Sequence, residues 1–409
     1  MKEISISMMI IYIAFLVVSC SSKIKMDQQI STKVNEIILR ETKILPGASR
    51  ISELLPQLLD KKLGLVVNQS SLIDQTHLVD TFYKLKLNIS KIFVPEHGFR
   101  GDMDAGKEIK DGVDQKSGAP IISLYGTKKK PTSEDMKGLD YIIFDIQDVG
   151  VRFYTYISTL QYIMEACIEH KVALILLDRP NPNGHYVDGP VLDLKFKSFV
   201  GLYPIPVVYG MTIGELANMI KGEAWIKNSD QLNLKVIPCV NYEHTSRISL
   251  PVKPSPNLPN ERSVLLYPSL CFFEGTVVSL GRGTSSPFQL YGHPDFTSAD
   301  TSFTPKAWPG AQNPPHKDVE CLGFSLLNQP MEDFYTLKRI DLSYLIKSYE
   351  LLSRPESFFL PNNFFDKLAG TDQLRMHLIN GLPETKIRKS WEPSINEFKK
   401  LRTKYLIYP

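Results

Sequence analysis

Residues 63–70 have the sequence LGLVVNQS, a short apolar run that ends in three polar residues. A run of this length between polar residues is typical of a strand that is buried on both faces. The pattern returns downstream, at residues 91–94, 121–125, 141–146 and 173–177. Apolar residues at helical spacing lie between or beyond these runs, at residues 77–85, 157–170 and 211–225. Strands that alternate with helices predict an α/β fold with a Rossmann-like, doubly wound, mostly parallel sheet.

Polar side chains follow the predicted strands. They are Asn68 after the first strand, Glu96 and His97 after the second, Asp145 and Asp148 at the fourth, and Arg179 and Asn181 after the fifth. In open α/β sheets, ligands bind outside the carboxyl ends of the strands. We therefore expect these residues to form one site.

The pattern changes after residue 240. Four prolines lie within residues 251–259, a density that excludes regular helix. A strand-like run at residues 270–273 and helical patterns at residues 342–352 and 364–378 follow. We therefore expect residues 46–240 to form the Rossmann-like domain and residues 241–409 to form a smaller α+β domain that closes over it.

The amino terminus has the features of an export signal. Lys2 is followed by an apolar run at residues 8–18, which is too short to span a membrane. The residues before Cys20 resemble a bacterial lipobox; a plain secretory signal is the alternative. Residues 1–19 are thus predicted to be a signal peptide, and residues 20–45 a tether followed by an entry helix. We expect an exported bacterial lipoprotein that faces the periplasm, held to a membrane only by lipids on Cys20.

Composition and motifs exclude several other classes. The formal net charge of +3 over 409 residues, with no broad basic run, argues against nucleic-acid binding. The chain has no G-x-G-x-x-G fingerprint, Walker A loop, G-x-S-x-G elbow or H-E-x-x-H motif, and its cysteine spacing matches no zinc site. We therefore expect no cofactor and no metal. His97, Asp102 and Asp104 form the alternative metal-binding set, although their spacing is not typical of one.

Several motifs combine acidic, basic and aromatic residues beside glycines. They are PEHGFRG at residues 95–101, DIQDVGVRFYTY at 145–156, DRPNP at 178–182, PSPNLP at 254–259, FEGT at 273–276 and GRGT at 281–284. A partly buried carboxylic acid such as Glu96 suits general acid catalysis, and an arginine can bind a carboxylate with two hydrogen bonds. A charged surface turn, a helix cap and aromatic core packing are the alternative interpretations.

Taken together and in this order, the six motifs resemble those of the exo-β-N-acetylmuramidase family, the NamZ or YbbC-like proteins. The resemblance extends over nearly the whole chain after the tether. It implies a glycosidase that removes non-reducing terminal N-acetylmuramic acid from peptidoglycan-derived saccharides. It also implies a Rossmann-like domain and a smaller domain with the active site between them.

The resemblance points to Glu96 as the acid/base, and we select Glu274 as the second carboxylate that glycosidases usually need. Retention, inversion and participation of the substrate's 2-acetamido group remain open. Arg282 is expected to bind the lactyl carboxylate of muramic acid, because its flanking glycines permit a close approach. The remaining predicted substrate-binding residues are Asn68, His97, Arg100, Asp145, Asp148, Arg152, Tyr154, Tyr156, Arg179, Asn181 and Asn257.

Two other functions compete with this one. A non-catalytic lipoprotein that binds peptidoglycan would have a cleft with aromatic residues but no paired carboxylates. A metal-dependent hydrolase would lose its activity with a chelator. The sequence predicts no oligomeric state.

Overall fold

The computed structural model describes residues 43–96, 98–99, 112–352 and 354–409. Within it, Pro46–Pro409 form one compact unit. The predicted signal peptide, Cys20 and nearly all of the tether lie outside the described residues.

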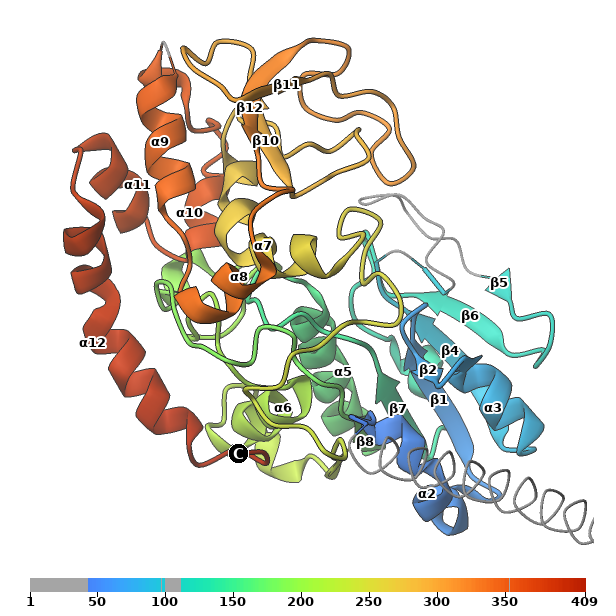
Figure 1. Ribbon diagram of the computed structural model, residues 1–409. Helices are drawn as coiled ribbons and strands as arrows, with labels where there is room; N and C mark the ends of the chain where they lie inside the picture. Colours follow the sequence, from blue (N-terminus) through green and yellow to red (C-terminus); the bar gives the residue numbers. More distant parts are fainter. Residues whose placement is uncertain (1–42, 97, 100–111, 353) are drawn as a thin grey trace, which may run out of the picture. The chain divides into compact units, whose positions relative to one another are not determined.

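A seven-stranded sheet forms the first part of this unit, in the order β5-β6-β4-β1-β7-β8-β9 (Figure 1). Its strands are β1 (Lys62–Val67), β4 (Asn88–Val94), β5 (Gly112–Val113), β6 (Pro120–Ser123), β7 (Tyr141–Asp145), β8 (Ala173–Leu177) and β9 (Leu234–Ile237). All of them are parallel except β5, which pairs antiparallel with β6 at one edge. From β1 the chain adds strands first on one side and then, from β7, on the other. This confirms the predicted doubly wound, Rossmann-like fold.

Helices cover both faces of the sheet, and β1 shows why. Leu65 and Val67 belong to a core that also contains side chains of α2 and α3, whereas Val66 belongs to a second core with α5 and α6. Successive side chains of a strand point to opposite faces, so a strand covered on both faces must be apolar throughout. The helices of this part are α2 (Ile51–Leu58), α3 (Leu78–Lys84), α4 (Ser133–Met136), α5 (Tyr156–His170) and α6 (Ile213–Gly222).

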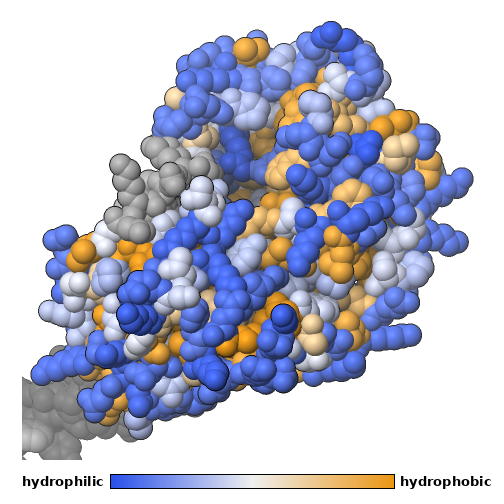
Figure 2. Space-filling model, turned by 180° about the vertical axis from the view of Figure 1, so that it is seen from behind, coloured by the Kyte–Doolittle hydropathy of each residue, from blue (hydrophilic) through white to orange (hydrophobic). Residues whose placement is uncertain are grey.

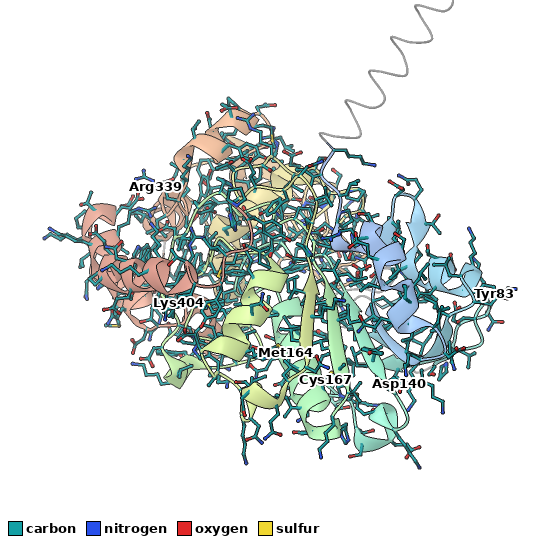
Figure 3. The ribbon with its side chains drawn as sticks, turned by 90° about the horizontal axis from the view of Figure 1, so that it is seen from below. Tyr83, Asp140, Met164, Cys167, Arg339 and Lys404 are labelled. Carbon is teal, nitrogen blue, oxygen red and sulfur yellow. The ribbon has the colours of Figure 1, made fainter. Side chains whose placement is uncertain are left out.

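Figure 3 contrasts the interior with the periphery of this part. Met164 and Cys167 on α5 are fully buried, while Tyr83 on α3 is at the edge and about half exposed. The other cysteines of the described residues, Cys239, Cys271 and Cys321, are buried as well, and all four are free thiols. Cys167 and Cys271 stand in apolar stretches of the sequence, which is consistent with these core positions.

The second part contains a small antiparallel sheet in the order β10-β12-β11, with α7 between it and the large sheet (Figure 1). Its elements are α7 (Glu261–Leu270), β10 (Leu290–His293), β11 (Thr301–Phe303), β12 (Cys321–Ser325), α8 (Met331–Leu337), α9 (Ser343–Leu351), α10 (Phe364–Ala369), α11 (Gln373–Ile379) and α12 (Glu384–Arg402). A smaller α+β domain is thus confirmed. One hydrophobic core runs through both parts, and the boundary at residues 240/241 stays a prediction.

Two local predictions were wrong. Residues 270–273, predicted as a strand, are the end of α7 and a 3-10 helix, η4 (Cys271–Gly275). All four residues are buried, and a short, fully apolar run has no periodicity that separates a strand from a buried helix. The single helix predicted for residues 364–378 is divided into α10 and α11, because Gly370 adopts a φ of 73° and ends α10.

Hydrophobic residues are interspersed with hydrophilic ones on the surface that Figure 2 shows, and they do not merge into one broad patch. Among the described residues, no helix has both the length and the apolar character needed to cross a bilayer.

Candidate active site

Four adjacent, parallel strands end at the same edge of the large sheet. They are β6, β4, β1 and β7, in that order. Tyr125, Glu96 and Asn68 lie just beyond the first three strands, and Asp145 is the last residue of β7. The direction in which strands are added reverses between β1 and β7, and such switch points are where open α/β sheets bind ligands.

A pocket with a volume of about 380 Å³ lies at this edge. It is lined by residues from the loops after β4 and β6, from the start of α5, from residues 255–258 and from residues 267–288. Six predicted site residues line it, namely Glu96, Tyr154, Tyr156, Asn257, Glu274 and Arg282. The structure therefore brings the two proposed catalytic carboxylates to one pocket, although 178 positions separate them in the sequence (274 minus 96).

Both oxygens of Glu96 accept hydrogen bonds. The hydroxyl of Tyr125 donates to Oε1 at 3.1 Å, and Oγ1 of Thr155 donates to Oε2 at 3.4 Å. Glu96 is partly buried, as befits a group that must reach a substrate. Neither donor was predicted. Tyr125 follows the third predicted strand, so the strand-end criterion applied to the other residues would have found it.

Glu274 forms an ion pair with Arg282, and both side chains line the pocket. Each of the two side chains keeps about 25% of its surface exposed, so both remain accessible from the pocket. Burial alone would lower the pKa of Arg282, but the charge and hydrogen bond of Glu274 raise it above its usual value. The guanidinium also lies over the ring of Phe288, 5.3 Å from its centroid.

The backbone conformation on both sides of Arg282 requires glycine. Gly281 and Gly283 adopt backbone φ values of 67° and 81°, which residues other than glycine rarely adopt. A Cβ atom on Gly283 would also lie 2.4 Å from the carbonyl oxygen of Lys306. The two glycines therefore let the chain turn sharply on both sides of the arginine.

Aromatic rings form much of the remaining wall. The rings of Tyr154 and Tyr156 meet edge to face at 4.9 Å, and Tyr154 makes a similar contact with Tyr267 at 5.9 Å. The Tyr154 hydroxyl donates to the carbonyl of Pro254 at 2.7 Å. The buried hydroxyl of Tyr156 has no hydrogen-bond partner among the described residues.

Asn257 is held at the pocket by its own loop. Its Nδ2 donates to the carbonyl of Gly310 at 3.0 Å, and its backbone N–H donates to Oγ of Ser255 at 3.1 Å. The proline-rich segment thus presents a fixed amide side chain.

Other predicted site residues lie outside the described pocket lining, and they form hydrogen bonds with other residues of the protein. Arg179 forms two hydrogen bonds with Asp145, from Nε at 2.6 Å and Nη2 at 2.9 Å, and both side chains are buried. Asp148 accepts hydrogen bonds from the Tyr209 hydroxyl and from the N–H of Gly150. Burial raises the pKa of Asp148 to about 6, although these hydrogen bonds act in the opposite direction.

Asn68 and Asn181 are buried as well. Oδ1 of Asn68 accepts from the N–H and hydroxyl of Ser70, and its Nδ2 has no partner among the described residues. Nδ2 of Asn181 donates to the carbonyl of Met211 at 2.8 Å, and its Oδ1 accepts from the N–H of Asn183.

Arg152 lies in the interior, where the two terminal nitrogens of its guanidinium donate to the main chain at four points. Nη1 donates to the carbonyls of Pro190 and Ile205, and Nη2 donates to those of Leu368 and Ala369, at 2.7 to 2.9 Å. Since substrate binding requires exposure, the structure gives Arg152 the role of joining loops. The sequence pattern did not distinguish the two roles.

His97, Arg100, Asp102 and Asp104 lie outside the described residues. Within the described part of the chain, no group of three or more His, Cys, Asp and Glu side chains is arranged to hold a metal ion.

Comparison with known proteins identifies the family. The model of the exo-β-N-acetylmuramidase NamZ N-terminal domain matches residues 63–262, and the model of the C-terminal domain matches residues 265–408. The chain belongs to the NamZ family. This confirms the resemblance that the six motifs indicated.

Relatives of known sequence and structure agree with this membership. The chain is 40% identical to the peptidoglycan β-N-acetylmuramidase NamZ of Bacillus subtilis (strain 168) over 383 residues, which are 88% of this chain and 90% of the relative. Two crystal structures of DUF1343 family proteins from Bacteroides fragilis NCTC 9343 have the same fold. One has a TM-score of 0.83 at 45% identity and the other 0.75 at 26%; the match covers 90% of this chain in both cases, and 99% and 100% of the respective crystal structures.

Proposed function

We propose that this protein is an exo-β-N-acetylmuramidase, a glycosidase that removes non-reducing terminal N-acetylmuramic acid from peptidoglycan fragments. The observation that supports it most directly is the presence of Glu96 and Glu274 on one pocket, in a chain of the NamZ family. Most glycosidases act through two carboxylates on either side of the bond that they cleave. The pocket volume of about 380 Å³ is in the range of small-molecule sites.

In the proposed reaction, the bond between C1 of the muramic acid and the glycosidic oxygen breaks. The departing oxygen gains a proton, and a water molecule supplies the hydroxyl group to C1. Glu96 transfers the proton, and Glu274 is the second carboxylate. Glu274 attacks C1, activates the water, or supports attack by the 2-acetamido group of the substrate, and the stereochemistry of the released sugar limits this choice.

The ion pair of Arg282 with Glu274 connects catalysis with substrate choice. The lactyl ether gives muramic acid a carboxylate that N-acetylglucosamine lacks, and a guanidinium binds a carboxylate with two hydrogen bonds. We expect Arg282→Ala to reduce hydrolysis of a β-N-acetylmuramide more than that of the matching glucosaminide. Arg282→Lys keeps the charge but loses the fork, and serves as the matched control. Equal losses on both substrates would contradict this role.

A chromogenic β-N-acetylmuramide tests the function itself. The native protein should release the chromophore, and Glu96→Gln should lower kcat by about 10²- to 10⁴-fold, because it removes the acid/base. Glu169→Gln, on the surface of α5, is the control with the same chemical change. A native protein that binds the substrate without releasing product would favour the non-catalytic lipoprotein, and loss of activity with a chelator would favour the metal-dependent hydrolase.

We further propose that the protein is exported and held to a membrane by lipids on Cys20, facing the periplasm. The apolar run at residues 8–18 and the lipobox-like residues before Cys20 support this. In cells fed labelled fatty acid, the wild type should carry the label in the membrane fraction, and Cys20→Ser should carry none. An unlabelled wild type would leave the plain secretory signal as the explanation.

A further inference from the structure

The surroundings of Glu96 suggest that another residue prepares it for catalysis. Tyr125 follows β6, and β6 pairs in parallel with β4, the strand that precedes Glu96. The two side chains therefore leave the same edge of the sheet from neighbouring strands. Their contact, 3.1 Å between the Tyr125 hydroxyl and Oε1 of Glu96, follows directly from the register of the sheet.

Thr155 approaches the other oxygen of Glu96 from a different element. It is the N-cap residue of α5, a position where threonine commonly accepts a hydrogen bond from its own helix. Here the side chain makes no such bond, and Oγ1 donates instead to Oε2 of Glu96 at 3.4 Å. The carboxylate thereby lies near the start of a 15-residue helix, where the helix dipole favours negative charge.

These contacts place one hydrogen-bond donor on each oxygen of the Glu96 carboxyl group. Hydrogen bonds donated to a carboxylate stabilise its charged form. Burial, followed by the charge and hydrogen bond of Glu96, raises the pKa of Tyr125 well above its usual range, so the phenol keeps its proton and stays a donor. Tyr156 is the other described titratable group with an electrostatic effect at Glu96. Among the described lining residues, the remaining charged groups, Glu274 and Arg282, pair with each other.

We propose that Tyr125 is a positioning residue for the reaction, which orients the carboxyl group of Glu96, with Thr155 as the second donor. This rests on the proposed function, because it assigns Tyr125 a role through Glu96. Tyr125 is half-buried and lines the pocket, so its ring also limits the rotation of the Glu96 side chain. The role differs from a structural one because it changes how activity depends on pH.

The test is the pH profile of kcat/KM on the chromogenic β-N-acetylmuramide for the wild type and Tyr125→Phe. A carboxylate that loses a hydrogen-bond donor is less stable in its ionised form. The limb of the pH profile that follows the ionisation of Glu96 should therefore move to higher pH by about one unit. At the optimum, kcat/KM should fall by about tenfold. A shift of the acidic limb means that Glu96 acts first as a base or nucleophile, and a shift of the basic limb means that it acts first as an acid.

Two controls keep the result specific. Tyr154→Phe removes a hydroxyl from the same pocket that donates to Pro254, so both limbs should stay where they are whatever the change in rate. Thr155→Ala should move the same limb as Tyr125→Phe, and Thr155→Ser, which keeps the hydroxyl, should not. These variants test the proposal independently if Tyr125→Phe fails to fold, which thermal unfolding would reveal.

A Tyr125→Phe protein that folds and has both limbs at the wild-type positions overturns the proposal, even if its rate is lower. So does a Thr155→Ala protein whose limbs are those of Thr155→Ser. Failure of the proposed function has a different signature, because the wild type would then release no chromophore at any pH.

Discussion

The carboxyl group of Asp148 is buried beside the pocket, and this has a consequence for stability. Its pKa is raised by burial to about 6, from an ordinary value of 3.8. Because the pKa is higher in the folded protein than in the unfolded chain, the protonated carboxyl group of Asp148 stabilises the fold. This contribution is fully present at pH values below the pKa of the unfolded chain. That contribution is lost as the pH rises through the folded pKa. Asp178 is shifted in the same direction, again mainly by burial.

We expect Asp148→Asn to raise the free energy of unfolding at pH 7 by about 3 kcal/mol, because a pKa shift of about two units is removed. The amide oxygen still accepts the hydrogen bonds of Tyr209 and Gly150. Urea unfolding at several values between pH 4 and pH 7 should show a smaller decline for this variant than for the wild type. Asp230→Asn, at an exposed position, should behave as the wild type. An identical decline in all three proteins would refute the prediction.

Tyr154 and Tyr156 provide a matched pair, since their rings touch and both line the pocket. Tyr154→Phe removes one of two donors to the Pro254 carbonyl, the other being Nε2 of Gln69 at 3.0 Å, and should cost about 1 kcal/mol of stability. Tyr156→Phe removes a buried hydroxyl that has no described partner, and should leave stability unchanged or slightly higher. Its kcat/KM should stay close to the wild-type value, because a hydroxyl without accessible surface does not reach a substrate. Thermal unfolding and kinetics on the same samples test both halves, and a destabilised Tyr156→Phe would contradict them.

At the scale of elements, Arg152 joins segments that are far apart in the sequence. Its four hydrogen bonds reach the carbonyls of Pro190 and Ile205 and, at the end of α10, those of Leu368 and Ala369. Burial also lowers the pKa of Arg152 to about 9, so the protein keeps a charge in its interior at neutral pH.

Arg152→Met should therefore lower the free energy of unfolding by about 3 kcal/mol or more, because it leaves several buried carbonyls unsatisfied. Arg375→Met removes an ion pair between Arg375 of α11 and Asp366 of α10. It should cost less stability, because Arg375 is partly exposed. Denaturant unfolding of both variants decides the comparison. Equal losses would mean that the four carbonyl contacts add little.

The elements also show how far the sequence was informative. The five strands predicted for the large sheet are all present, because burial on both faces requires an unbroken apolar run. β9 was not predicted, since Leu234–Ile237 lies at the sheet edge and only Ile237 is buried. In β10 and β12, Gly292 and Gly323 interrupt the alternation and face each other closely.

The candidate site was predictable in part for a related reason. The position of Glu96 at a strand end, and the glycines around Arg282, have local signatures. The partners of Arg152 and Arg179 do not, because a charged residue in a motif has the same sequence signature whether it binds a ligand or its own fold. Tyr267 reaches the pocket from α7 only through the packing of the second part, which no local pattern reports.

At the scale of the molecule, both parts of Pro46–Pro409 share one hydrophobic core, which extends from Val66 in β1 to Phe398 in α12. Polar contacts connect the parts too. Arg388 on α12 binds Asp188 at 2.8 Å, and Tyr405 binds Glu223 at 2.6 Å. The pocket has residues of both parts in its lining, so its geometry depends on their remaining packed together.

We therefore expect the two parts to unfold in one transition, although chains of this length commonly unfold in several steps. Trp225 lies in the first part, stacked on Tyr203, and Trp391 lies in α12. Two variants that each keep only one of these tryptophans, with Trp308 replaced by Phe in both, report the parts separately by fluorescence. Their midpoints in urea, each compared with the circular dichroism of the same variant, should coincide. A midpoint for Trp391 clearly below that for Trp225 would show that the second part unfolds alone, and that the shared core does not couple the two sides of the pocket.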